Sequence, residues 1–234
     1  MTKVAIMQPT YLPWLGYFAL MNAVDVFILL DSVQFARRSW QQRNQIKTNN
    51  GPAWLTIPVI SKGMRDQQIY QVGIDDSQNF RENHKKSIEL NYKKSKYFHE
   101  LSVDFFSIFN AKQTNLCSFN IDLILWIKNY LDIDTKILRS SNLAQNGSKA
   151  DLLLSLCQQV KATEYISPIG SKNYLEDSDA FSRAGLSYTY FNYHHPQYSQ
   201  LYGSFEPYMS IIDLLFNCGP ESKSILLAGD NIES

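Results

Sequence analysis

The stretch KVAIMQPTYLPWLGYFALMNAVDVFILL, at residues 3–30, decides the fold class. Residues 3–7 read as a short buried strand, which must stop by Pro9 because proline has no N–H to donate to a sheet. Residues 14–23 are predicted to form a helix, and residues 25–30 a second buried strand. A strand, a helix and a second strand in so short a stretch indicate a βαβ unit and therefore a parallel sheet.

The rest of the chain continues this alternation. Further strands are expected at 53–60, 69–74, 135–139, 164–167 and 187–193, and further helices at 149–160, 173–184 and 207–217. Between residues 78 and 131 apolar side chains recur every three or four positions, which predicts two or three helices with breaks near 93–96 and 110–115. We therefore expect a single α/β domain over 1–234, with a mostly parallel sheet, flanking helices and an inserted helical block near 80–131.

Composition limits the classes of function. The 22 basic and 22 acidic residues cancel, so no net positive field is available to bind nucleic acid. The three cysteines are far apart and form no metal-binding cluster with histidine, so we expect reduced, buried thiols and no metal site. No secretory signal is visible, and no apolar stretch approaches the roughly 18 residues that span a bilayer. These features predict a cytoplasmic protein without a transmembrane segment.

Polar and aromatic residues follow the first predicted strand, where ligands bind in open α/β sheets. Gln8, Tyr11 and Trp14 are candidates for substrate binding, and Gly16 is expected to let the backbone approach a ligand. The alternative is a proline-shaped turn with packing aromatics. Nucleotidylyltransferases and pantothenate-synthetase-like enzymes carry a His-x-Gly-His motif at the comparable point, but this stretch lacks both imidazoles.

A second group of candidates follows the second strand. Asp31 ends that strand, and Gln34, Arg43, Asn44 and Lys47 come next. On a helix, Arg43 and Lys47 would share a face and clamp a phosphate or carboxylate. In an extended segment, Arg43, Gln45 and Lys47 would share a face instead.

The remaining candidates lie further along the chain. His84 stands in a charged segment, and Gly170 and Tyr174 follow the strand predicted at 164–167. His195, with Tyr198 and Gln200, follows the strand predicted at 187–193. By residue type His195 is the best general base, because an unperturbed imidazole titrates near neutrality.

Long stretches of the sequence resemble the WbqC-like protein family. They are AIMQPTYLPWLGYF (5–18), LLDSVQFARRSWQQRNQIK (29–47), AWLTIPV (53–59), HKKSIELNY (84–92), YISPIGSKNYL (165–175), HPQYSQ (195–200) and SIIDLLFNCG (210–219). The resemblance implies a bacterial protein of O-antigen or other surface-polysaccharide (lipopolysaccharide) biosynthesis. Carried over by motif, it supports Asp31, His84 and His195 as catalytic candidates. The substrate-binding candidates that it supports are Gln8, Tyr11, Trp14, Gly16, Gln34, Arg43, Asn44, Lys47, Gly170, Tyr174, Tyr198 and Gln200.

Three functions follow as hypotheses. The first is a transferase that attaches an acyl or aminoacyl group, from an acyl-CoA or acyl-carrier donor, to the amino sugar of a nucleotide sugar, with His195 or His84 as the base. The second is a nucleotidylyltransferase-like enzyme that activates a small carboxylate or a sugar phosphate. The third is a non-catalytic protein that binds a sugar or another protein. The sequence does not predict an oligomeric state.

Overall fold

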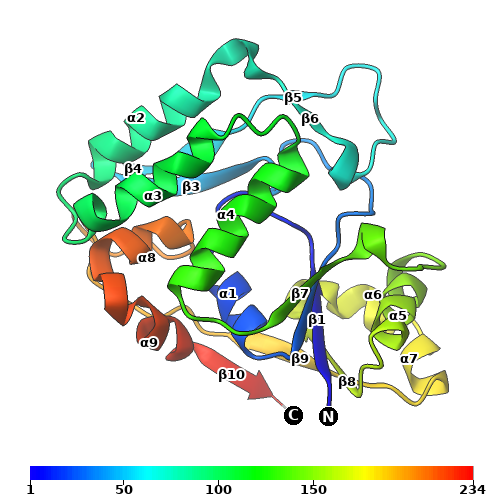
Figure 1. Ribbon diagram of the computed structural model, residues 1–234. Helices are drawn as coiled ribbons and strands as arrows, with labels where there is room; N and C mark the ends of the chain where they lie inside the picture. Colours follow the sequence, from blue (N-terminus) through cyan, green and yellow to red (C-terminus); the bar gives the residue numbers. More distant parts are fainter. Residues whose placement is uncertain (234) are drawn as a thin grey trace.

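The computed structural model describes residues 1–233, with Tyr174 and residues 230–233 described by their backbone alone. Its centre is a six-stranded sheet (Figure 1). In spatial order the strands are β10 (Asp230–Glu233), β9 (Ser187–Tyr193), β8 (Glu164–Pro168), β1 (Lys3–Met7), β2 (Val26–Leu29) and β7 (Lys136–Arg139). All neighbours pair in parallel except β10, which runs antiparallel to β9 at the edge. The predicted α/β class with a mostly parallel sheet is confirmed.

The order of the parallel strands creates a switch point beside β1. The chain passes from β1 to β2 and β7 on one side, and then returns to place β8 and β9 on the other side of β1. The loops that leave β1 and β8 at their carboxyl ends therefore diverge, and such a divergence opens the crevice in which open α/β sheets bind ligands.

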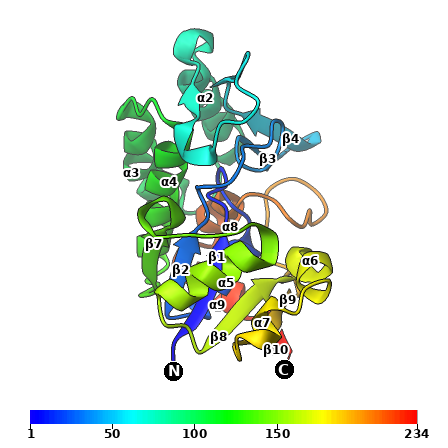
Figure 2. The same ribbon diagram turned by 90° about the vertical axis from the view of Figure 1, so that its right-hand side faces the viewer.

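Helices cover both faces of the sheet (Figures 1 and 2). One face carries α1 (Leu15–Asn22), α8 (Ile211–Cys218) and α9 (Ser222–Leu227), and the other carries α5 (Lys149–Gln159), α6 (Lys172–Glu176) and α7 (Ala180–Arg183). Successive residues of β1 point to opposite faces, as the pleat of a strand requires. Ala5 joins the core beneath α1, whereas Val4 and Ile6 pack with the side chains of α5 and α7.

The segment between β2 and β7 forms the upper half of Figure 1. It contains an antiparallel hairpin of β3 (Arg43–Thr48) and β4 (Gly51–Thr56), the short pair β5 (Val59–Ile60) and β6 (Gly73–Ile74), and the helices α2 (Phe80–Tyr92), α3 (Phe98–Asn110) and α4 (Leu116–Tyr130). The breaks between these helices fall where the apolar spacing was predicted to lapse. Buried side chains of α2–α4 belong to the same core cluster as those of α1 and α8.

Several elements differ from the sequence-based expectation. Residues 69–74 form a 3₁₀ turn at Ile69–Gln71 and then the two residues of β6, because Leu116 of α4 bonds to the Val72 carbonyl. The helix predicted at 173–184 is two short helices, and the last apolar helix begins at Ile211 rather than at residue 207. Ser210 is the N-cap of that helix: its ψ of 143° is extended rather than helical, and its N–H bonds to the Gln45 carbonyl of β3. No helix among the described residues is long and apolar enough to cross a membrane.

Candidate functional site

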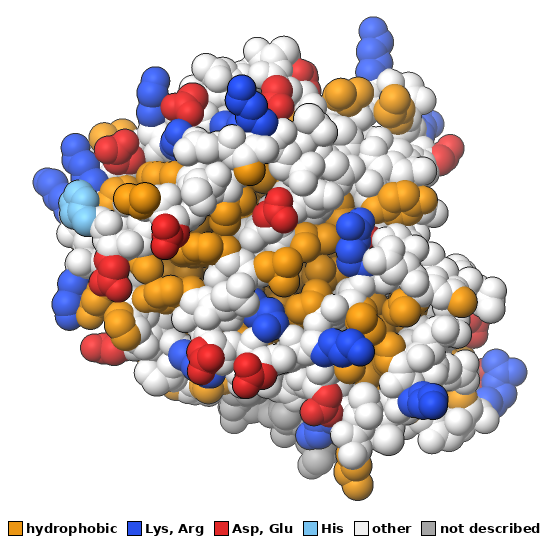
Figure 3. Space-filling view, viewed as in Figure 1, with side chains coloured by type: hydrophobic (Ala, Val, Ile, Leu, Met, Phe, Trp, Pro, Cys, Tyr) orange, Lys and Arg blue, Asp and Glu red, His pale blue; other side chains and the backbone are white. Residues whose placement is uncertain are grey.

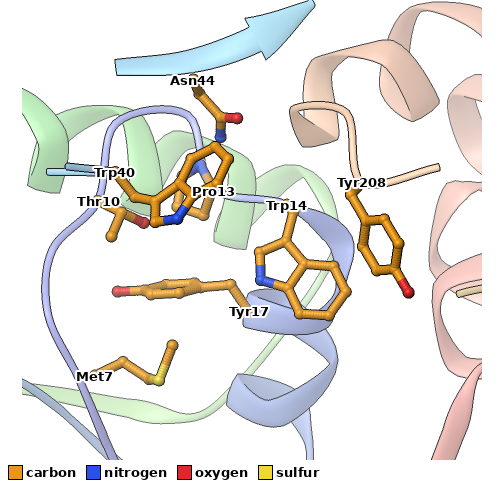
Figure 4. A pocket seen from close by; sticks show the side chains of 8 residues that line it. All are labelled: Met7, Thr10, Pro13, Trp14, Tyr17, Trp40, Asn44 and Tyr208. Carbon is orange, nitrogen blue, oxygen red and sulfur yellow. The ribbon is translucent and has the colours of Figure 1, made fainter. Parts of the chain in front are cut away.

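Three adjoining cavities form one crevice at the carboxyl ends of β1, β8 and β9. The central cavity, about 270 Å³, is lined by Met7, Thr10, Pro13, Trp14, Tyr17, Trp40, Asn44 and Tyr208 (Figure 4). A second cavity of about 280 Å³ shares Met7, Thr10 and Trp40 and adds Gln8, Gln41, Pro168 and Ser171, so it lies at the switch point between β1 and β8. A third, open cavity of about 690 Å³ shares Tyr208 and adds Tyr193, His194, His195 and Gln197. No described residue that lines these cavities carries a formal charge, with histidine neutral.

Trp14 occupies the place that Gly16 was expected to keep open for a ligand. A Cβ atom built on Gly16 would lie 2.3 Å from Cη2 of the Trp14 indole, closer than two carbon atoms can approach. The expectation for Gly16 is therefore corrected: this glycine makes room for the indole, not for a substrate backbone. Trp14 is further held by a bridge to Ser210 and lines the wall of the central cavity (Figure 4).

The loop between β1 and α1 is fixed from β3 and α4. Leu12 has a φ of 44°, in the left-handed region that non-glycine residues rarely adopt. Nδ2 of Asn44 donates to the carbonyl oxygens of Tyr11 and Leu12, at 3.2 and 2.6 Å. Nδ2 of Asn120, on α4, donates to the carbonyls of Pro9 and Gln41. Asn44 therefore lines the cavity, but its amide shapes the loop.

Gln8 offers a hydrogen-bond donor to the second cavity. The N–H of Ala36 donates to Oε1 of the buried Gln41, which fixes the orientation of that amide. Nε2 of Gln41 then donates to Oε1 of Gln8 at 2.8 Å. The two N–H groups of Gln8 have no protein acceptor among the described residues, so they are available to a ligand oxygen in the crevice.

His195 lies in an aromatic cage at the open end of the crevice. Its ring lies against Trp14, Tyr198, Phe205 and Tyr208, with centroids between 5.2 and 6.3 Å apart. Nδ1 is 2.9 Å from the Pro196 carbonyl, which can only accept, so the proton of the neutral ring is on Nδ1. Burial lowers the pKa of His195, although the bond to Pro196 acts in the opposite direction. The ring is therefore neutral near pH 7. The lone pair of Nε2 accepts no hydrogen bond, and the atom is buried.

Lys47, Tyr198 and Gln200 meet in a hydrogen-bond network around Asp213 of α8. Oδ2 of Asp213 accepts from the Tyr198 hydroxyl and from Nε2 of Gln200, at 2.8 and 2.7 Å, and Oδ1 accepts from the Tyr92 hydroxyl. Nζ of Lys47 donates to Oε1 of Gln200 at 3.0 Å. Burial raises the pKa of Asp213, while hydrogen bonds from Tyr198, Tyr92 and Gln200 act against that rise. The Tyr198 ring stacks on the His195 ring, so the network that holds the Tyr198 hydroxyl also positions the imidazole.

The predicted cationic clamp does not form. Residues 43–48 are a strand, so the helical alternative is wrong, and residues four apart on a strand are roughly 13 Å apart. The Arg43 guanidinium stacks on Trp54 at 4.2 Å from the ring centroid, whereas Lys47 is buried in the Asp213 network. Two cations at that separation cannot hold one phosphate between them.

His84 and Tyr11 form a buried pair beneath the β3–β4 hairpin. Their side chains are joined at 2.8 Å between Nδ1 of His84 and the Tyr11 hydroxyl. Burial lowers the pKa of His84 to about 4, although a hydrogen bond with the Thr56 backbone acts in the opposite direction. Neither residue lines the crevice, so we interpret the pair as a packing contact that secures the loop after β1.

Asp31 is enclosed by donors from the end of β7 and from the turn that follows it. Its Oδ1 accepts from the Ser140 hydroxyl and the Ser141 N–H, and its Oδ2 accepts from Nε of Arg139 at 2.7 Å and from the Ser141 hydroxyl. The Cys117 thiol adds a longer contact of 3.8 Å. The carboxylate is fully buried and lines none of the three cavities, so it ties β2 to β7.

Gln34 and Gly170 line none of the three cavities. Gln34 is exposed, and its Nε2 donates to the Arg65 carbonyl at 2.9 Å. Gly170 lies in an exposed 3₁₀ turn, and a Cβ there would meet nothing within 4 Å. The side chain of Tyr174 is outside the described part of the structure.

Sequence reasoning missed several residues that the structure brings to the site. Tyr17 lies three residues after Trp14, a helical spacing that could have placed both on one side of α1. Its hydroxyl points into the same region as the Thr10 side chain (Figure 4), and it is buried without a hydrogen-bond partner. Asp213 lies in the stretch 210–219 that resembles the family, but no local pattern marks it as a neighbour of Lys47 or marks Tyr208 as a neighbour of Trp14.

Comparison with known proteins identifies the family. The model of the WbqC-like protein family matches residues 8–225. This chain belongs to the WbqC-like family. It is 40% identical over 228 residues to a Mycobacterium tuberculosis protein named "Uncharacterized protein Rv1507c", and the match covers 97% of this chain and 98% of that one. No solved structure matches the chain significantly. The family match spans the loop after β1, the β3–β4 hairpin and His195, so the residues that line the crevice, apart from Ile6 and Met7, lie within the matched region.

Proposed function

We propose that this WbqC-like protein is a cytoplasmic enzyme of surface-polysaccharide biosynthesis, which transfers an acyl or aminoacyl group to an activated amino sugar. The observation that carries the proposal is the state of His195. A neutral imidazole, oriented by the Pro196 carbonyl and with Nε2 unpaired, stands at the carboxyl end of β9 beside a crevice at the sheet's switch point.

The crevice suits a sugar ring. Trp14, Trp40 and Tyr208 offer aromatic faces to the apolar C–H surface of a pyranose, and Gln8 offers amide N–H groups to its hydroxyls. No charged side chain among the described residues lines these cavities, so the uncharged sugar and acyl group belong inside and the phosphates of a nucleotide sugar remain outside.

In the proposed reaction the sugar amine attacks the carbonyl carbon of a thioester donor, an acyl-CoA or an acyl-carrier protein. A C–N bond forms, the C–S bond breaks, and Nε2 of His195 takes the proton that the amine loses. Because Nε2 is buried, this step requires the aromatic cage around the ring to open toward the amine. The imidazolium returns that proton to the departing sulfur, which leaves as a thiol, and the product is an amide. The Asp213–Tyr198 contact keeps the ring in place during both transfers.

A second candidate is the nucleotidylyltransferase-like enzyme that activates a small carboxylate or a sugar phosphate. The observation in its favour is the strand order, in which the five parallel strands, numbered along the chain, lie as 3-2-1-4-5. This order is that of doubly wound nucleotide-binding sheets. The uncharged crevice and the absence of the imidazole pair after β1 favour the transferase.

The test is an assay of the purified protein with nucleotide-linked amino sugars and acyl-CoAs, followed by mass spectrometry of the sugar product. His195→Gln should reduce turnover about a hundredfold or more, as expected when a general base is lost. His99→Gln, at an exposed histidine of α3, is the matched control and should leave turnover unchanged. Full turnover of His195→Gln would rule out the base role.

Two other results would select the other functions. Release of pyrophosphate from a nucleoside triphosphate in the presence of a carboxylate or sugar phosphate would identify the nucleotidylyltransferase-like enzyme. Binding of the nucleotide sugar, seen as a rise in melting temperature, with no product from any donor would identify a binding protein.

A further inference from the structure

The basic residues of this neutral chain are unevenly distributed. Six of the 22 basic residues and none of the 22 acidic residues lie between positions 32 and 65. Of these six, Arg37, Arg38, Lys62 and Arg65 are exposed, whereas Lys47 is buried. The nearest exposed acid along the chain is Asp66, at the end of the segment. The segment therefore presents a local positive charge that the net charge conceals.

Two tryptophans of the same segment face solvent. Trp40 is 51% exposed and Trp54 is 44% exposed, and their ring centroids are 5.3 Å apart. The Arg43 guanidinium stacks on Trp54. Large exposed aromatics are costly to leave in water, and a pair of them beside cations is typical of an interaction surface rather than of a solvated one.

The loop that follows β5 extends this surface. It is tied to the segment before Trp40, since Nε2 of Gln34 donates to the Arg65 carbonyl and the Phe35 N–H donates to the Gln67 carbonyl. Ile60 and Met64 are both exposed there, beside Lys62. Figure 3 shows apolar and basic side chains together over the region of β5, at the upper right, with an acidic side chain at their edge.

We propose that this surface, formed by Arg37, Arg38, Trp40, Trp54, Lys62, Met64 and Arg65, docks the protein on an anionic phospholipid membrane. Indole rings favour the boundary between headgroups and acyl chains, and arginine and lysine beside them attract anionic headgroups. No acid lies between residues 32 and 65, and the exposed Asp66 that follows Arg65 offsets only part of the charge of the four exposed cations. Peripheral binding of this kind needs no membrane-spanning helix.

Docking would place the crevice at the membrane. Trp40 belongs to this surface and also lines two of the three cavities, so its indole stands between the lipid headgroups and the mouth of the crevice. A substrate held at the membrane surface would then enter from the side on which the protein rests. The proposal concerns the surface alone and does not depend on the reaction in the crevice.

The test is co-sedimentation of the full chain with vesicles of phosphatidylcholine alone or of phosphatidylcholine and phosphatidylglycerol in equal parts. The protein should sediment with the anionic vesicles and not with the neutral ones, and raised salt should release it. Arg37→Gln with Arg38→Gln should weaken binding by about tenfold or more. Trp40→Ala with Trp54→Ala should abolish binding and also the quenching of tryptophan fluorescence by brominated lipid.

Two double variants serve as controls. Lys93→Gln with Lys94→Gln removes an adjacent pair of exposed cations from the turn after α2. Leu90→Ala with Val103→Ala removes two exposed apolar side chains, one from α2 and one from α3. Both should bind like the parent chain. An equal loss in the controls, equal binding to both kinds of vesicle, or binding to single-stranded oligonucleotides but not to vesicles would overturn the proposal. Unfolding curves of each variant will establish that it is folded.

Discussion

The imidazole of His195 lies nearly parallel to the indole of Trp14, with ring centroids 6.3 Å apart and an interplanar angle of 19°. The two residues come from opposite ends of the chain and from the loops after β1 and β9. Their contact joins the central cavity to the open one, because Trp14 lines the former and His195 the latter. Changes that displace Trp14 should therefore disturb His195.

Gly16→Ala is expected to displace the Trp14 indole. The new methyl group would overlap the ring, and the resulting overpacking should lower the free energy of unfolding by about 1–3 kcal/mol. Gly170→Ala is the matched control, since a Cβ there meets no atom within 4 Å and the change should be nearly neutral. Urea denaturation of both variants measures the difference. Equal stability of the two would show that the indole does not fill the space above Gly16.

His84 should make the folded state sensitive to acid. Its pKa is about 4 when folded and near 6.5 when unfolded, so between these values the unfolded chain binds more protons. The neutral, buried imidazole contributes stability above pH 6.5, and this contribution is lost as the pH falls through 4. The difference in pKa corresponds to about 3 kcal/mol.

The measurement is the free energy of unfolding as a function of pH for the parent chain, His84→Gln and His99→Gln. The loss of stability between pH 6.5 and 4 should be smaller in His84→Gln and unchanged in His99→Gln, whose histidine is exposed. The same slope in all three proteins would contradict the assignment of a buried, neutral His84.

Asp213→Asn should destabilise the network that supports His195. An asparagine amide would place an N–H group opposite Nε2 of Gln200 or the Tyr92 hydroxyl, and an unsatisfied buried donor costs about 1–3 kcal/mol. Asp104→Asn, on the exposed surface of α3, should change the free energy of unfolding by no more than about 0.5 kcal/mol. A neutral effect of Asp213→Asn would show that the carboxylate is not needed there.

Much of the architecture could be predicted because it depends on local patterns. The apolar runs at β1 and β2 and the repeat at α2–α4 reflect burial of whole faces, which the order of residues records directly. The ends of the chain's last elements could not be predicted. By apolar spacing Ser210 belongs to the last helix, but its backbone is extended and its N–H donates to the Gln45 carbonyl of β3, 165 positions away along the chain.

The candidate site was only partly visible in the sequence. Gln8, Trp14 and His195 follow strands, and they line the crevice together with Asn44 of β3. Tyr11, Asp31 and His84 were equally plausible candidates by residue type, yet in the structure they hold loops and strands together. Their catalytic or binding roles remain predictions, and the geometry gives them no access to the crevice.

The sequence by itself determined the parallel α/β fold and the family, because strand and helix periodicity and long motifs are local properties of the chain. Only the tertiary structure decided which polar residues face a ligand. Whether an imidazole or a carboxylate is free depends on the partners that the fold brings to it, such as Ser141 for Asp31 and Tyr11 for His84. Those partners lie 110 and 73 positions away along the chain, and no local sequence pattern marks residues so far apart as neighbours.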